Sequence, residues 1–131
     1  MIILSGCVTK YIKKVPEEDK LRDRVTKYWE HKMNREFDKS YDFEYPLYRK
    51  AVSMVNYIEY APKHIRLLNA EIADIQIKGE QATVGLNVKA WIGIPQFPMK
   101  KGDSYTSYRK ERWVKAGDEW YHLPKKFQIG N

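Results

Sequence analysis

The fold is decided by residues 16–39, PEEDKLRDRVTKYWEHKMNREFDK, and by the change of pattern that follows them. Pro16 suits the first turn of a helix, and the acidic residues 17–19 place negative charge at the positive end of the helix dipole. Apolar residues then recur at spacings of three and four along one stripe: Leu21, Val25, Tyr28, Trp29, Met33 and Phe37. The stretch predicts one long amphipathic helix over residues 16–39.

Two shorter helices are expected next, over residues 46–52 and 53–60, with Pro46 opening the first and Ser53 capping the second. From residue 65 onward the pattern is typical of strands. Residues 82–92, ATVGLNVKAWI, alternate between an apolar face and a second face that carries most of the polar residues. Helices followed by about four antiparallel strands predict an α+β fold, with the helices packed on one face of a bent sheet.

Composition favours one compact domain. The chain has 131 residues, of which 43% are hydrophobic and 14% aromatic, and this content opposes disorder. No apolar run approaches the roughly 18 to 20 residues of a membrane span. The single cysteine excludes an internal disulfide and a zinc site built from several cysteines. We expect a tether over residues 1–15 and one domain over residues 16–131.

The net charge of +7 is spread along the chain, without a basic tail. The densest mixture of basic and aromatic residues is Tyr108-Arg109-Lys110-Glu111-Arg112-Trp113, which is the pattern of a single-strand nucleic-acid binder. The alternative is an exposed strand face interrupted by an acidic residue, and we favour it. We therefore do not favour nucleic acid as the partner. Attraction to an anionic membrane surface is an equally good explanation of the diffuse positive charge.

Known catalytic patterns are missing from the sequence. It has no G-x-S-x-G, G-x-G-x-x-G or G-x-x-x-x-G-K motif, and its three histidines lack metal-binding spacing, so neither a metal nor a cofactor is expected. Asp74, which interrupts an apolar strand, and His122, near a strand end, are weak candidates for an acid or base. The alternatives are a solvated carboxylate and a structural hydrogen bond.

Aromatic residues supply the material for a ligand cavity. Pockets are mostly apolar with a few orienting polar groups, and Tyr and Trp can bury their rings while their O–H or N–H meets a ligand. The cavity-lining candidates lie in elements expected to converge: Tyr28, Trp29, Tyr41, Tyr48, Trp91, Tyr108 and Trp113. Alternatively these rings fill the core completely, which would leave only partner binding.

Near the N-terminus, Leu4-Ser5-Gly6-Cys7 matches the bacterial lipobox, in which small residues precede a cysteine that receives lipid. Only six residues precede Cys7, and they include neither a basic region nor a full hydrophobic region. We nevertheless expect Cys7 to be lipidated and to hold the domain on the bacterial cell envelope, facing the periplasm or the exterior. An unmodified cysteine and a cytoplasmic protein are the alternative.

Several segments carry a family resemblance: Arg24 to Trp29, Phe37 to Phe43, Pro46 to Arg49, and an ending made of Arg112 to Lys115, Gly117 and Glu119 to His122. Their aromatic residues and turns resemble nuclear-transport-factor-2-like domains, over about residues 17–124. The resemblance implies a long helix and two short helices on a strongly bent, cone-shaped sheet with an inner cavity. It implies no catalytic set, because no motif of the superfamily's enzymes surrounds Asp74 or His122.

The function expected from these observations is a noncatalytic, membrane-anchored binding or assembly module. Its partner would be a small apolar ligand, another protein or a second copy of the chain. The first alternative is a small cofactor-free isomerase, dehydratase or cyclase that uses an acid/base pair in the cone. The second is a single-stranded nucleic-acid binder. Fold alone does not choose between them.

Overall fold

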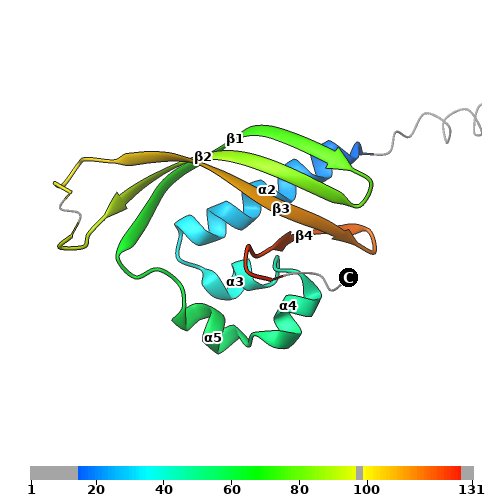
Figure 1. Cartoon of the computed structure of the whole chain (residues 1–131), viewed down its shortest axis with the longest axis horizontal. Coiled ribbons are helices and arrows are strands. Elements are labelled where there is room, and N and C mark those ends of the chain that lie inside the picture. Colours follow the sequence, from blue (N-terminus) through cyan, green and yellow to red (C-terminus); the bar gives the residue numbers. More distant parts are fainter. Residues whose placement is uncertain (1–14, 97–98, 128–131) are drawn as a thin grey trace, which may run out of the picture.

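The computed structural model describes residues 15–96 and 99–127, and it confirms the α+β class (Figure 1). Within these residues four helices come first and four strands follow. Their bounds are α2 (Glu17–Met33), α3 (Phe37–Tyr41), α4 (Pro46–Ala51), α5 (Met54–Glu59), β1 (Ile65–Lys78), β2 (Gln81–Ile92), β3 (Tyr105–Ala116) and β4 (Glu119–Leu123). Among the described helices, none has the length and apolar character needed to cross a membrane.

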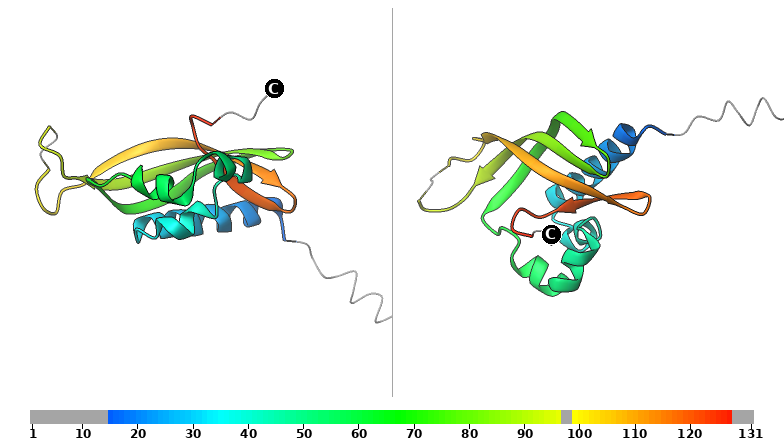
Figure 2. Two further views of the ribbon diagram at one scale, coloured as in Figure 1. Left: turned by 90° about the horizontal axis from the view of Figure 1, so that it is seen from below. Right: turned by 45° about the vertical axis from the view of Figure 1, so that its right-hand side comes forward.

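The strands form one antiparallel meander in the order β1-β2-β3-β4, so β1 and β4 are its edges. Register shifts interrupt the β1–β2 ladder between Leu67 and Asn69 and again between Ile72 and Asp74. Such irregularities bend a strand and increase its twist. Figure 2 shows the resulting curvature, with α2 lying along one face of the sheet.

The core lies between α2 and the sheet. On α2, Leu21, Val25, Tyr28 and Trp29 are buried, as the spacing predicts. On β2, alternate residues from Ala82 to Ala90 face this helix and are buried. Trp113 of β3 and Trp120 of β4 are fully buried and complete the cluster. The apolar stripe of α2 and the apolar face of the strands therefore pack against each other in one core.

The prediction of one helix to residue 39 is wrong. Helix α2 ends at Met33, Asn34 caps it, and Arg35 has φ of 57°, which is left-handed backbone that no helix continues through. A new helix, α3, begins at Phe37, whose side chain is still buried. The apolar stripe runs through both helices, and for that reason periodicity alone did not reveal the break.

The two short helices agree closely with the bounds predicted from the sequence. Helices α4 and α5 lie within one residue of the expected bounds at each end, and Ser53 caps α5 by accepting a hydrogen bond from the backbone N–H of Asn56 at 3.2 Å.

A cone around a central cavity is not confirmed. The core between α2 and strands β3 and β4 is filled instead, because Trp29, Trp113 and Trp120 each have 2% of their surface or less exposed.

Candidate functional site

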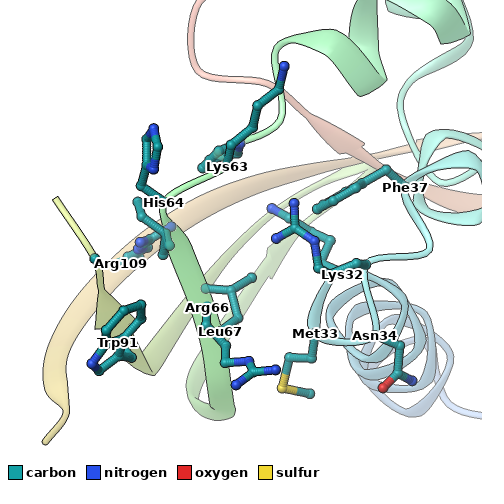
Figure 3. A pocket seen from close by; sticks show the side chains of 14 residues that line it. Lys32, Met33, Asn34, Phe37, Lys63, His64, Arg66, Leu67, Trp91 and Arg109 are labelled. Carbon is teal, nitrogen blue, oxygen red and sulfur yellow. The ribbon is translucent and has the colours of Figure 1, made fainter. Parts of the chain in front are cut away.

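A large pocket, with a volume of about 580 Å³, lies where the C-terminal end of α2 meets the start of β1 (Figure 3). This volume is within the range of about 300–1,000 Å³ that small-molecule sites occupy. Helix α2 and the residues after it contribute Lys32, Met33 and Asn34, and β1 contributes Arg66 and Leu67. The pocket is therefore built by segments that are far apart in the sequence.

Local backbone geometry shapes this pocket. Helix α2 stops at the pocket, and the left-handed Arg35 turns the chain toward α3. On the other side, Arg66 of β1 pairs with Trp91 of β2, and the N–H of Gly93 donates to the carbonyl of His64 at 2.8 Å. The paired ends of β1 and β2 thus form one wall, and the end of α2 forms another.

The lining is strongly basic. Five cationic side chains line the pocket: Lys32, Arg35, Lys63, Arg66 and Arg109. No Asp or Glu stands among the described residues around it. Apolar surface comes from Met33, Phe37, Leu67 and Trp91 among others. The pocket therefore offers positive charge and aromatic surface in the same space.

Lys32 is the half-buried member of this set. Its ammonium lies 4.4 Å from the ring centre of Trp29 and 4.9 Å from that of Tyr28, and both are cation–π distances. Burial lowers the pKa of Lys32; Glu111 and Glu44 oppose this shift and the positive charge of Arg109 adds to it. Arg109 lies near the same ring, with its guanidinium carbon 5.9 Å from the centre of Trp29.

The two ends of α2 differ in whether their cations form ion pairs. In the earlier turns, Lys20, Arg22, Arg24 and Lys27 each lie within 4.0 Å of a carboxylate oxygen. The five pocket cations form no ion pair with any carboxylate in residues 15–96 and 99–127. The pocket therefore carries positive charge that no ion pair of the described residues offsets, although Glu111 and Glu44 act on Lys32 from beyond ion-pair distance.

A second charged site lies nearby and is built around Glu44, which is 1% exposed. Backbone hydrogen bonds fix it against β4: the N–H of His122 donates to Phe43, and the N–H of Tyr45 donates to His122, at 2.8 and 2.9 Å. These contacts form an isolated parallel bridge between Glu44 and His122. The loop after α3 is thereby joined to the edge strand, and the two side chains are brought together.

The carboxylate of Glu44 is fully partnered. Its Oε2 accepts hydrogen bonds from the hydroxyls of Tyr28 and Tyr57, at 2.6 and 2.9 Å. Its Oε1 lies 2.7 Å from Nδ1 of His122. On the other side of the ring, Nε2 of His122 lies 3.5 Å from Glu111. Within the described chain, every buried side-chain nitrogen and oxygen has a partner.

These contacts decide the charges in the cluster. Burial by itself raises the pKa of Glu44, but the charge of His122 and the three hydrogen bonds outweigh it, and the pKa is lowered. Burial by itself lowers the pKa of His122, but Glu44 and then Glu111 outweigh it, and the pKa is raised. Burial, followed by the charge of Glu44, raises the pKa of Tyr28, whose hydroxyl remains a donor. The cluster is a closed ion pair.

Glu111 extends this cluster into the core. Its Oε1 accepts from the indole N–H groups of Trp29 and Trp113, at 3.1 and 3.2 Å. Glu44 and His122 also line a small pocket of about 180 Å³, which shares Lys32, Phe37 and Pro62 with the large one. The volume of this second pocket is below the usual range for small-molecule sites.

The two weak acid/base candidates lie far apart in the fold. His122 is in the buried cluster just described. Asp74 lies on the face of the sheet away from α2, where its Oδ2 accepts the hydroxyl of Tyr108 at 2.9 Å. Both side chains lie over Gly85, where a β-carbon would come within 2.2 Å of the tyrosine hydroxyl and 2.6 Å of the carboxylate. A glycine there leaves room for this exposed pair.

The aromatic cavity candidates are distributed over several environments. Trp91 lines the large pocket, and Tyr28 and Tyr48 line the small one. Trp29 lies beside a further groove between α2 and β1. Tyr41 is buried and donates to the carbonyls of Arg49 and Val52, and Trp113 is fully buried in the core. The structure does not gather the seven rings around one cavity.

The basic and aromatic run at residues 108–113 is divided by the alternation of β3. Arg109 pairs with the buried Leu86 and lines the large pocket, whereas Lys110 pairs with Gly85 on the opposite face. Trp113 is fully buried and presents no ring to a base. Cys7, the expected site of lipid attachment, lies outside the described residues.

Comparisons with known proteins give a likeness of fold. No family model matches the chain, and no curated protein matches it. A SEC-C motif containing protein from Rhodopseudomonas palustris is 18% identical, with a TM-score of 0.57 over 82% of this chain and 75% of that one. A SEC-C motif containing protein from Psychrobacter arcticus is 12% identical, with a TM-score of 0.62 over 92% of this chain and 67% of that one. At such identities the likeness concerns the fold alone.

This finding overturns the resemblance to nuclear-transport-factor-2-like domains. The two solved structures named above share the fold of this chain, and both are SEC-C motif containing proteins rather than nuclear-transport-factor-2-like domains. The resemblance rested on aromatic residues and turns, which several α+β arrangements can accommodate, because they report burial and chain reversal rather than a particular topology.

Several residues of these sites were not singled out by the sequence. Glu44 was visible only as a polar residue in a loop before Pro46, and no spacing links it to a strand 78 residues later. The five pocket cations are scattered from residue 32 to residue 109. Their joint signal exists only after α2, β1 and β3 have been placed in space.

Proposed function

We propose that this chain is a noncatalytic binding module that holds a small ligand in the large pocket between α2 and β1. The observation that carries the proposal is the pocket itself, whose volume of about 580 Å³ combines aromatic surface with cations that have no acidic partner among the described residues. A concave site of this size with a few polar groups is the usual form of a ligand site.

The experiment begins with native mass spectrometry of protein purified from its own host, followed by thermal-shift screening of a small-molecule library. We expect a retained or stabilising compound whose effect is lost in Trp91→Ala, because Trp91 lines the pocket. The matched control is Tyr108→Ala, which removes a half-exposed ring that does not line it. A screen without any bound or stabilising compound would contradict the proposal.

A small enzyme remains the second candidate, because a buried carboxylate and imidazole lie 2.7 Å apart beside the small pocket. Its difficulty is the raised pKa of His122, because the charges of Glu44 and Glu111 favour the protonated ring, which is not a base. NMR titration of His122 decides the matter. A pKa below 6.5 would favour the enzyme, and one above it favours the structural ion pair.

We propose in addition that the module acts at a bacterial cell envelope through a lipidated Cys7. Support comes from the lipobox-like Leu4-Ser5-Gly6-Cys7 and from the net positive charge, which suits anionic headgroups. Mass spectrometry of the protein from its own host tests the modification. An unmodified Cys7 would leave the ligand proposal intact and remove the membrane address.

A further inference from the structure

We propose that the ligand of the large pocket is an organic anion with at least two negative charges on one end and a flat apolar body. This inference rests on the proposed function and specifies its ligand class. A phosphomonoester is the simplest compound of this kind, because it presents two charges and several acceptor oxygens in a compact group.

The first argument is the sign of the lining. Five cationic side chains surround the same space, from α2, the turn after it, the segment before β1, β1 itself and β3, and no acidic side chain in the described chain lines it. A neutral apolar ligand would leave all five without an ion pair. An anion balances them, and arginine binds phosphate or carboxylate oxygens through paired hydrogen bonds.

The second argument is the crowding of like charges. Lys32 and Arg109 both lie against Trp29, at 4.4 and 5.9 Å from its ring centre. The fold holds these two cations close together without an ion pair. By contrast, the cations in the earlier turns of α2 each lie within 4.0 Å of a carboxylate oxygen. Like charges held together without an ion pair favour the binding of an anion, although Glu44 and Glu111 act on the charge of Lys32 from beyond ion-pair distance.

The third argument separates an organic anion from a simple inorganic ion. A bare phosphate would need only a small basic cradle, whereas this pocket has about 580 Å³ and is lined also by Phe37, Leu67 and Trp91. An aromatic ring in the ligand would find apolar and aromatic partners there. The charged end would lie near the cations, and the flat body would occupy the remaining volume.

The test uses isothermal titration calorimetry at constant ionic strength with three probes: 1-naphthyl phosphate, the neutral 1-naphthol and inorganic phosphate. We expect 1-naphthyl phosphate to bind at least roughly tenfold more tightly than either of the others, since one charge-assisted contact contributes about that factor or more. Arg66→Gln/Arg109→Gln should weaken its binding by a further factor of roughly ten or more. Both side chains are exposed, so the fold should be retained.

The matched control is Lys78→Gln/Lys110→Gln, which removes two exposed charges from the same strands without touching the pocket lining. We expect its affinity to stay within about twofold of the parent, because distant exposed charges are screened. An equal loss in both double variants would overturn the inference, since the attraction would then come from net charge.

The remaining outcomes distinguish this inference from the proposed function. If 1-naphthol binds as tightly as 1-naphthyl phosphate, the pocket is a ligand site but the charge assignment is wrong. If inorganic phosphate binds as tightly as 1-naphthyl phosphate, the inference that the ligand has an apolar body is wrong. If no probe binds while the library screen yields a neutral ligand, the inference fails and the proposed function stands. If the screen is empty as well, both fail.

Discussion

The large pocket and the Glu44 cluster are neighbours in the fold, but they differ in whether their charged side chains form ion pairs. In the cluster, a buried carboxylate contacts His122, Tyr28 and Tyr57, so its charge is compensated inside the chain. In the pocket, five cations line the same space and form no ion pair with a carboxylate of the described residues, although Glu44 and Glu111 act on the charge of Lys32. Internal compensation indicates a structural role, and its absence indicates a ligand. The two sites should therefore respond differently to mutation.

The largest expected effect is that of Glu44→Ala. The substitution leaves His122 and two tyrosine hydroxyls without their partner in a buried place. Breaking one side of a buried pair costs about 3–5 kcal/mol. Urea denaturation should show this loss in the free energy of unfolding. Glu44→Gln is the control and should lose less, because the amide still accepts a hydrogen bond. A loss below 1 kcal/mol for Glu44→Ala would mean that the cluster is not a structural element.

The next effect is that of Trp113→Phe, which removes one of the two indole donors to Glu111. Glu111 keeps Trp29 and His122, so the loss is partial. We expect about 1–3 kcal/mol from the unpaired group and the smaller ring. Tyr108→Phe, which removes a donor to an exposed carboxylate, is the contrast and should change little. Similar losses in the two variants would contradict the distinction between compensated buried charge and exposed charge.

The pH dependence of stability follows from the same cluster. His122 has a raised pKa, so its contribution is complete below the ordinary value of 6.5 and is lost as pH rises through the folded-state pKa. Glu44 has a lowered pKa, so its contribution is present above the ordinary value of 4.5 and is lost as pH falls through the folded-state pKa. Stability from this pair should be greatest between these two ordinary values. Urea titrations from pH 4 to 9 measure it, and His122→Gln should flatten the alkaline side. An unchanged alkaline slope in that variant would assign the effect elsewhere.

The smallest effect is expected in the pocket without ligand. Arg66→Gln and Arg109→Gln remove exposed charges that have no ion-pair partner among the described residues, so each should change stability by less than about 0.5 kcal/mol. Thermal melts of the two single variants check this. A clear destabilisation would show that the cations support the fold, which would weaken the argument that they serve a ligand.

The sequence by itself determined the α+β class, the start of α2 and the helical face that is buried. It also determined the alternation of β2 and the Ser53 cap, since these features depend on contacts between near neighbours in the chain. It did not determine the end of α2. The left-handed Arg35 and the restart at Phe37 keep one apolar stripe, and periodicity therefore extended the helix too far.

Only the tertiary structure decided the sites. His122 was visible as a candidate, but its partner Glu44 reaches it through a parallel bridge between a loop and an edge strand. Asp74, the other candidate, lies on the opposite face of the sheet and contacts Tyr108. The basic pocket depends on where α2 stops, because Lys32 and Arg35 meet the first residues of β1 only at that point. Local patterns report burial and turns, whereas the charge around a pocket is a sum over segments that the chain brings together by folding.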